Sequence, residues 1–309
     1  MELVERVFNF PDDYEGPVIS TLISAQTPKK SESAVLYIHG YIDYFFQLHM
    51  AEVFLQAGYN FYALDLRKYG RSLLEHQHFN YCRDMKEYYP EIDQAIETIR
   101  SEGNSFIAMI GHSTGGLLAS LYCAEDGQGG KNRIYVNQLI LNSPFLEFNT
   151  PWFVRAVGIP LISSVSRLFP YAKMKNVLSP YYAVSVHKSM KGEWDYDLKL
   201  KPSEGVPLYL AWLRAVRLGQ KRVKRGLKIA VPVLVMHSER SSWEKEWDDI
   251  IARSDAVLDV RHIKKYAPRL AHSVTLAEIP EGLHDLVLSR EPVRNRVFSF
   301  MLDWISKKR

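Results

Sequence analysis

The chain has 309 residues, of which 47% are apolar and 24% charged, so it can bury a large core like an ordinary globular protein. Its 39 basic and 35 acidic residues are mostly interleaved and leave a formal net charge of only +4, which gives no reason to expect nucleic acid as a partner. The two cysteines, Cys82 and Cys123, are too few for a disulfide scaffold and too isolated for a metal site.

The first residues of the chain do not look like a secretory leader. Residues 1–6 are acidic and lack an apolar segment. No stretch of the sequence reaches the roughly 18 uninterrupted apolar residues that suggest a membrane-spanning helix. We therefore expect a cytoplasmic protein with no transmembrane segment.

Predicted strands and helices alternate along the first half of the chain. Two short antiparallel strands are expected at residues 4–10 and 18–24. After them, apolar runs and helical spacing predict strand 34–39, helix 46–57, strand 60–65, helix 88–102, strand 105–110, helix 117–124 and strand 138–142. Such alternation is typical of a mostly parallel sheet with helices on both faces.

The alternation stops after residue 144 and resumes with a buried strand at 231–237. The stretch between them holds six prolines and many aromatic residues. The chain is then completed by a helix near 260–266, a strand near 272–277 and a helix at 293–307. We predict one α/β core made of residues 1–144 and 229–309, with a mostly helical cap at 145–228 inserted over the carboxyl edge of the sheet.

A Gly-x-Ser-x-Gly motif joins the strand at 105–110 to the helix that follows. It reads Gly111-His-Ser-Thr-Gly115. A tight strand-to-helix turn with this motif is a nucleophile elbow, which exposes the serine hydroxyl at the sheet edge. The two glycines are needed because side chains there would collide with the strand and the helix. We predict Ser113 as a nucleophile.

A serine hydroxyl needs a base to accept its proton, and that base is most often a histidine oriented by a carboxylate. In chains with this elbow the order is serine, acid, histidine. His284 lies after the last predicted strand and before the last helix, which is the position that the base requires.

Three carboxylates are candidates for the acid, which should follow the strand at 231–237. Asp255 precedes a small residue, two apolar residues and a helix start, and this setting favours it. Asp259 has an alternative role as the N-cap of that helix. Glu239 lies close to the strand end. We predict Asp255 and keep Asp259 and Glu239 as alternatives.

The tetrahedral intermediate of acyl transfer needs two backbone N–H donors. We expect one from Thr114, directly after the nucleophile. The other should come from Tyr41, in the loop after the strand at 34–39, where Gly40 lets the backbone approach the substrate.

In this pattern the chain resembles the α/β-hydrolase superfamily, and within it the monoglyceride lipase-like, serine aminopeptidase S33-type hydrolases. The motifs that carry the resemblance are Tyr37-Ile-His-Gly40, Asp65-Leu-Arg-Lys-Tyr-Gly-Arg-Ser72, Gly111-His-Ser-Thr-Gly115, Asn142-Ser-Pro144, Asp255-Ala-Val-Leu-Asp259 and Gly282-Leu-His-Asp285. The resemblance implies Ser113 as nucleophile, His284 as base, Asp255 as acid, and an inserted cap. The stretch between residue 238 and Asp255 is longer than is usual in the family.

We therefore expect a serine hydrolase that cleaves a small-molecule acyl ester through an acyl-enzyme, without a metal or organic cofactor. An acyltransferase, a thioesterase or a peptidase would use the same triad. A catalytically silent fold used for binding is the alternative from another class.

Two features of the inserted stretch bear on the substrate and on partners. Its many aromatic residues suit an apolar pocket for an acyl chain, although they could equally form the core of the cap. Residues 214–228 hold seven basic residues and no acid, which fits either a solvated helix face or peripheral contact with anionic lipid. Nothing else in the chain supports a nucleic-acid partner.

Overall fold

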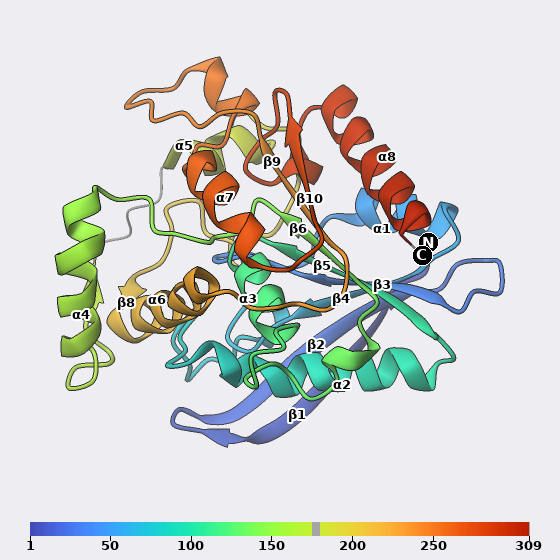
Figure 1. Cartoon of the computed structure of the whole chain (residues 1–309), viewed down its shortest axis with the longest axis horizontal. Helices are drawn as coiled ribbons and strands as arrows, with labels where there is room; N and C mark the ends of the chain where they lie inside the picture. Colours follow the sequence, from blue (N-terminus) through green and yellow to red (C-terminus); the bar gives the residue numbers. More distant parts are fainter. Residues whose placement is uncertain (175–179, 309) are drawn as a thin grey trace.

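The computed structural model describes residues 1–174 and 180–308. Its centre is a twisted sheet with the strand order β1-β2-β4-β3-β5-β6-β9-β10 (Figure 1). The strands are β1 Val4–Asp13, β2 Gly16–Ala25, β3 Ser33–Ile38, β4 Asn60–Asp65, β5 Phe106–His112, β6 Gln138–Asn142, β9 Val233–Ser238 and β10 Val274–Ile279.

The sheet is mostly parallel, as predicted. Only β1 with β2 and β2 with β4 pair antiparallel, while the other five pairs are parallel. The register aligns the carboxyl ends of the central strands: Ile38 is opposite Gly111, and His112 is opposite Asn142. Loops that leave β3, β5 and β6 therefore start side by side at one edge of the sheet.

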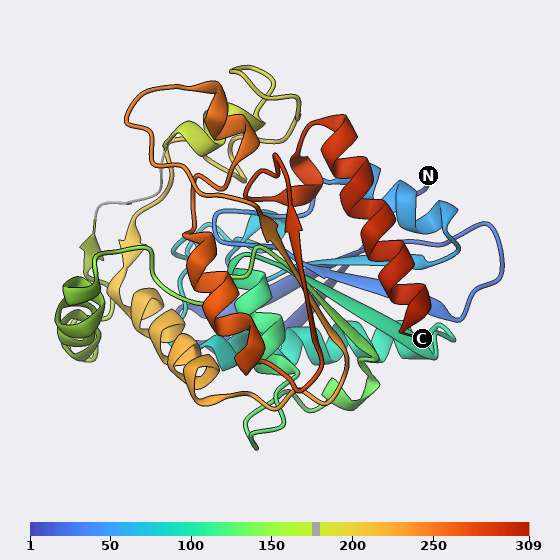
Figure 2. The same ribbon diagram turned by 45° about the horizontal axis from the view of Figure 1, so that its top comes forward.

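Helices cover both faces of the sheet, which confirms the α/β class (Figures 1 and 2). The helices outside the predicted cap are α1 Leu48–Gln56, α2 Tyr89–Ser101, α3 Thr114–Tyr122, α7 Val260–Tyr266 and α8 Glu291–Lys307. Alternate residues of β3 point to opposite faces. Leu36 joins a cluster that includes α2 and α3, whereas Val35 and Tyr37 join a cluster that includes α1 and α8.

The helix after the elbow begins earlier than predicted. It starts at Thr114, directly after the turn, and not at residue 117. The sequence signal is weak there because Gly115 and Gly116 are poor helix formers. Their lack of side chains is nevertheless what lets this first turn pack against neighbouring backbone and Pro144.

The stretch between β6 and β9 combines helices with two very short strands and long irregular segments where it is described. It contains a short π-helix η4 Val154–Gly158, α4 Ile159–Val165, β7 Lys173–Met174, α5 Pro180–Val186, β8 Leu208–Tyr209 and α6 Leu210–Arg225. Residues 175–179, which also fall within the predicted cap, lie outside the described part.

Residues of this stretch belong to the apolar clusters on both faces of the sheet. α6 lies against α3, and Val216 and Val223 belong to the cluster shared with α2. Val186 and Tyr196 belong to the cluster shared with α1 and α8. The division into a core and a separate cap at 145–228 stays a prediction. No helix in the described part of the chain is both long and apolar enough to cross a membrane.

Candidate active site

Ser113 occupies a strained turn between β5 and α3. Its backbone angles are φ +52° and ψ −115°, a conformation that side-chain-bearing residues rarely adopt. A Cβ on Gly111 would lie 2.6 Å from the Gly115 carbonyl oxygen, and a Cβ on Gly115 would lie 2.2 Å from that of His39. Only glycine fits at either position, which is why the predicted elbow forms here.

The structure brings Ser113, His284 and Asp255 together from three loops. The Nε2 atom of His284 lies 3.0 Å from Ser113 Oγ, and its Nδ1 atom lies 2.9 Å from Asp255 Oδ2. All three side chains are buried. Since the acceptor at Nδ1 is a carboxylate, the ring carries its proton there and leaves Nε2 free to accept the serine proton.

The second oxygen of Asp255 is also occupied. Its Oδ1 accepts hydrogen bonds from the backbone N–H groups of Val257 at 2.9 Å and Leu258 at 2.7 Å. These bonds orient the buried carboxylate so that Oδ2 faces the histidine.

The other two candidate acids have partners elsewhere. Asp259 is the N-cap of α7, where it accepts from Arg261 N and forms an ion pair with the Arg261 guanidinium. Hydrogen bonding from Arg261 holds the pKa of Asp259 below its usual value. Glu239 forms an ion pair with Arg240 and accepts from the N–H of Glu281.

The two expected N–H donors lie at the same place as the serine. Tyr41 and Thr114 line a cavity together with Ser113 and His284. Thr114 is the first residue of α3, whose first-turn N–H groups have no partner within the helix. Such a helix start favours developing negative charge. Tyr41 packs its ring on Trp212 of α6, with the ring centroids 4.1 Å apart.

The cavity has a volume of about 860 Å³ and lies above Ser113. Most of its wall comes from the stretch between β6 and β9, including Val154, Ile159 and Leu213. The long segment before Asp255 supplies a further wall through Trp243 and Ile251. A volume of this size with a mainly aliphatic and aromatic lining is suited to a small organic molecule.

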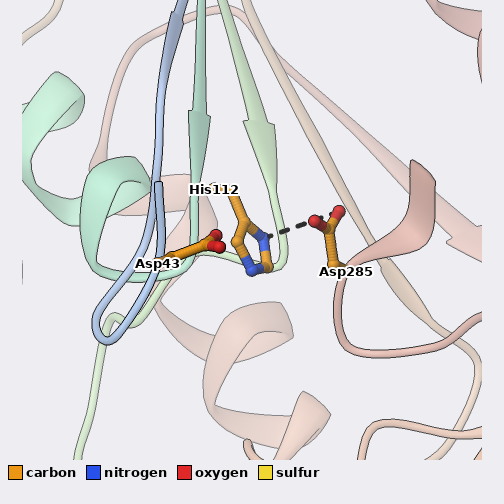
Figure 3. A group of neighbouring side chains, drawn as sticks. All are labelled: Asp43, His112 and Asp285. Carbon is orange, nitrogen blue, oxygen red and sulfur yellow. Dashed lines mark ion pairs between the residues drawn. The ribbon is translucent and has the colours of Figure 1, made fainter. Parts of the chain in front are cut away.

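Beside the cavity floor, Asp43 and Asp285 lie on opposite sides of the His112 ring (Figure 3). His112 Nδ1 is 4.0 Å from Asp285 Oδ1 and 3.2 Å from the Asn142 carbonyl oxygen, to which it donates. Burial is the main cause that lowers the pKa of His112, so its ring is neutral at neutral pH. The side chain of Asn142 donates to Asp285 at 2.6 Å.

These three side chains could in principle hold a cation, because their donor atoms lie within 4.8 Å of one another. Both carboxylates are already engaged, however. The Lys201 ammonium is 2.6 Å from Asp43, and Asp285 accepts from Asn142. The donor set fits a hydrogen-bonded network better than a metal centre.

Sequence reasoning did not find this network. Asp285 directly follows His284, and Asn142 ends β6 at the sheet edge. The sequence therefore placed both residues next to the predicted site and could have suggested a role for them there. Lys201 gave no signal, because it is 158 positions from Asp43 and only the fold brings the two together.

The sheet order, the strained serine turn and the position of His284 after the last strand define an α/β-hydrolase fold. A family model described as serine aminopeptidase, S33 matches residues 29–291. The chain therefore belongs to the serine aminopeptidase S33 family. Comparison with curated proteins by sequence finds no match.

Solved structures of similar fold cover almost the whole chain. A monoglyceride lipase from Saccharomyces cerevisiae, crystallised as a soluble variant with a substrate analogue, is 16% identical with a TM-score of 0.72, over 99% of this chain and 96% of that one. A monoacylglycerol lipase from Paleococcus ferrophilus is 18% identical with a TM-score of 0.67, over 100% of both chains. A carboxyl esterase from Bacillus coagulans is 12% identical with a TM-score of 0.64, over 98% of both chains. At these identities the likeness establishes the fold.

Proposed function

We propose that this protein is a serine hydrolase that cleaves carboxylic esters through an acyl-enzyme. The observation that carries the proposal is the hydrogen-bonded row Ser113–His284–Asp255 at the base of a mostly apolar cavity. The names of the structural neighbours, two of which are lipases of monoacylglycerols, support an ester as the substrate class.

In the proposed reaction, Ser113 Oγ attacks the ester carbonyl while His284 Nε2 takes its proton. The N–H groups of Tyr41 and Thr114 hold the oxyanion that forms. The C–O bond to the alcohol then breaks, and His284 returns the proton to the departing alkoxide. Water attacks the acyl-enzyme by the same steps, gives up a proton to His284, and releases the carboxylic acid and a free serine.

A peptidase is the second candidate, and one observation favours it. Two carboxylates, Glu204 and Glu244, line the cavity and could bind a substrate amine. The family description also contains the word aminopeptidase. The ester is the stronger candidate because the rest of the cavity wall is mostly apolar and suits an acyl chain.

A fluorophosphonate probe followed by a substrate panel tests these proposals. The wild-type protein should be labelled on Ser113, and Ser113→Ala should lose both labelling and turnover, with a loss on the order of a million-fold. p-Nitrophenyl esters from acetate to dodecanoate should be hydrolysed faster than aminoacyl p-nitroanilides. An adduct on another residue would overturn the assignment of the nucleophile. Faster anilide cleavage would favour the peptidase.

Part of the inserted stretch exposes an unusual apolar face, here called the 152–169 face. Its exposed members are Trp152, Phe153, Val157, Leu161, Val165, Leu168 and Phe169. The opposite side of the same segment is buried through Ile159, Ser163 and Ser166. α4 lies at the periphery of the molecule, with α6 between it and α3 (Figure 1). Contiguous exposed apolar surface of this kind marks an interaction site.

We propose that the 152–169 face binds an anionic phospholipid surface. The charge supports this partner: residues 148–174 contain no acidic residue, and beside Arg155, which pairs with Glu147, they hold Arg167 and Lys173. Apolar side chains with flanking cations are the pattern of a helix that lies in a membrane interface. Val154 and Ile162 of the same segment line the cavity, so a lipid substrate would leave the bilayer next to the serine. The basic run at 214–228 is a weaker candidate, because Arg222 and Lys224 already pair with Asp126 and Glu147.

Co-flotation with vesicles of phosphatidylcholine, with and without phosphatidylserine, tests this contact. The protein should bind the anionic vesicles, and Leu161→Asp should weaken binding at least about tenfold by placing a charge in the interface. Ile134→Asp changes an equally exposed apolar residue outside the face and serves as the control. Equal binding by both variants would reject the face as the lipid contact. If the protein without vesicles is a dimer and Leu161→Asp makes it monomeric, the 152–169 face binds a second copy of the chain instead.

A further inference from the structure

We propose that Lys201, from the inserted stretch, is a positioning residue that holds the oxyanion loop through its ion pair with Asp43. The oxyanion loop is defined here as residues 40–47, between β3 and α1. The inference rests on the proposed function, because it assigns to this loop the N–H group of Tyr41. It goes further by making part of the predicted cap a component of the catalytic machinery.

The oxyanion loop has a conformation that needs outside support. Ile42 has φ +51°, in the left-handed region that a β-branched residue rarely occupies. Strain of this kind costs of the order of 1–3 kcal/mol and persists only where surrounding contacts enforce it. Ile42 directly follows Tyr41, so relaxation of its strained backbone would displace the segment that carries the N–H group that the reaction needs.

The ion pair is buried next to this strained position. Lys201 Nζ lies 2.6 Å from Asp43 Oδ1, and the two residues are only 9% and 2% exposed. The ammonium also lies over the rings of Phe46 and Tyr196, at 4.9 Å and 5.4 Å from their centroids. Burial disfavours the charged carboxylate, but the Lys201 ammonium holds the pKa of Asp43 below its usual value.

Two further contacts join the same segments. The N–H of Asp197 donates to the hydroxyl of Tyr44 at 2.8 Å, and the rings of Phe46 and Tyr196 lie 4.9 Å apart. The turn that carries Lys201 is closed by its own N–H, which donates to the Asp197 carbonyl oxygen. Residues 196–201 therefore contact the oxyanion loop at three positions, Asp43, Tyr44 and Phe46.

The core holds the second half of the loop, at Phe45 and at Gln47, whose side chain donates to the Tyr37 hydroxyl. Phe45 N donates to Asp65 at 2.8 Å, and Arg71 donates to the Phe45 carbonyl oxygen at 3.0 Å. Along the chain, Asp43 lies closer to Tyr41 than Phe45 does. Without Lys201 a buried carboxylate would stay unpaired there, which is strongly unfavourable, and the loop would move to hydrate it. A shift of about 1 Å at a donor costs on the order of a hundredfold in rate.

The test compares Lys201→Met with two matched variants. Asp43→Asn combined with Lys201→Met removes both charges and leaves no unpaired carboxylate. Lys188→Met removes an exposed ion pair with Asp195 in the same inserted stretch, and serves as the control. The measurements are kcat and KM for p-nitrophenyl acetate, the rate of fluorophosphonate labelling, and hydrogen exchange of the peptide covering residues 40–47.

We expect Lys201→Met to lower kcat and the labelling rate by about 10- to 100-fold, with KM for this short ester changed less than about threefold. Exchange of the 40–47 peptide should be faster, while peptides from α3 stay unchanged. The neutral double variant should recover most of the rate, and Lys188→Met should match the wild type. If Lys201→Met does not fold, the neutral double variant must fold and exceed Asp43→Asn, which leaves the Lys201 ammonium unpaired, in kcat for the proposal to stand.

Unchanged kcat and unchanged exchange in Lys201→Met would overturn the proposal. A rise in KM with constant kcat would also overturn it, because Lys201 would then contact substrate and not the loop. Should wild-type protein fail to react with the fluorophosphonate, the proposed function would fail by itself. The exchange measurement would still decide whether Lys201 anchors the loop.

Discussion

At the scale of single residues, the surroundings of a carboxylate decide what it can do. Asp255 and Asp259 are four positions apart and both accept backbone N–H groups near the start of α7. Asp255 is fully buried and presents one oxygen to His284. Asp259 presents its oxygens to Arg261. The first arrangement can stabilise an imidazolium, whereas the second caps a helix.

Amide substitutions separate these two roles. Asp255→Asn should lower kcat for a short ester by about ten-thousandfold, because the amide favours the wrong histidine tautomer. Asp259→Asn should leave activity within about twofold, since Asn caps helices as well as Asp does. Turnover of p-nitrophenyl acetate at neutral pH measures both, with Glu239→Gln as a third arm. A large loss in Asp259→Asn or Glu239→Gln, with Asp255→Asn near wild type, would reassign the acid.

At the scale of elements, β5, α3 and the loop after β3 form one unit around the serine. The carbonyl oxygens of Ile38 and His39 lie where a side chain on Gly115 would go. The Ser113 N–H donates to the Asn142 carbonyl oxygen, and its own carbonyl accepts from Phe145 N. The strained serine turn is therefore held by backbone from two neighbouring strands, β3 and β6, and from the loops that follow them.

A methyl group at Gly115 tests how tightly this unit is packed. Gly115→Ala should lower the free energy of unfolding by about 3 kcal/mol or more, because backbone atoms have to move to make room. Gly158→Ala is the matched control: its nearest contact would be 3.5 Å from a Val154 methyl, in a helical segment. That change should be neutral or stabilise by up to about 1 kcal/mol. Urea unfolding measures both, and equal stability of the two variants would contradict the close approach described here.

At the scale of the whole molecule, the sheet separates two large apolar clusters, and the stretch between β6 and β9 joins both. Cys82 and Cys123 lie in the cluster on the α2 and α3 side, and both are buried. Burial raises the pKa of the Cys123 thiol to about 12 and also raises that of Cys82. The thiolate, which is the reactive form, is therefore scarce in the folded protein.

Thiol accessibility consequently reports on the integrity of the whole fold. At pH 8 the native protein should react with a chromogenic disulfide reagent far more slowly than a free thiol does, because both groups are buried and protonated. In 8 M urea two thiols per chain should react within the mixing time, as their pKa values return to the ordinary range. Rapid reaction of one thiol in the native protein, with Cys82→Ser and Cys123→Ser identifying which, would show that its side of the sheet opens.

Most residues of the candidate site could be predicted because local sequence patterns indicate them. The elbow needs two glycines around Ser113, strand and helix periods are visible on either side, and the base must follow the last strand. The choice among three acids remained open, because a carboxylate before a helix start has the same local pattern whether it faces a histidine or caps the helix. Only the positions of His284 and Arg261 in space distinguish Asp255 from Asp259.

By itself, the sequence determined the fold class, the strained serine turn and the order of the elements. These features follow from backbone geometry and from the spacing of apolar residues within single strands and helices. The tertiary structure alone decided which distant side chains meet. It placed Lys201 on Asp43, grouped His112 with Asp285 and Asn142, and left the 152–169 face uncovered. The physical reason is that charge pairing and burial depend on distances in space. Residues far apart in the sequence become neighbours when the chain folds, and the local sequence pattern does not reveal which ones do.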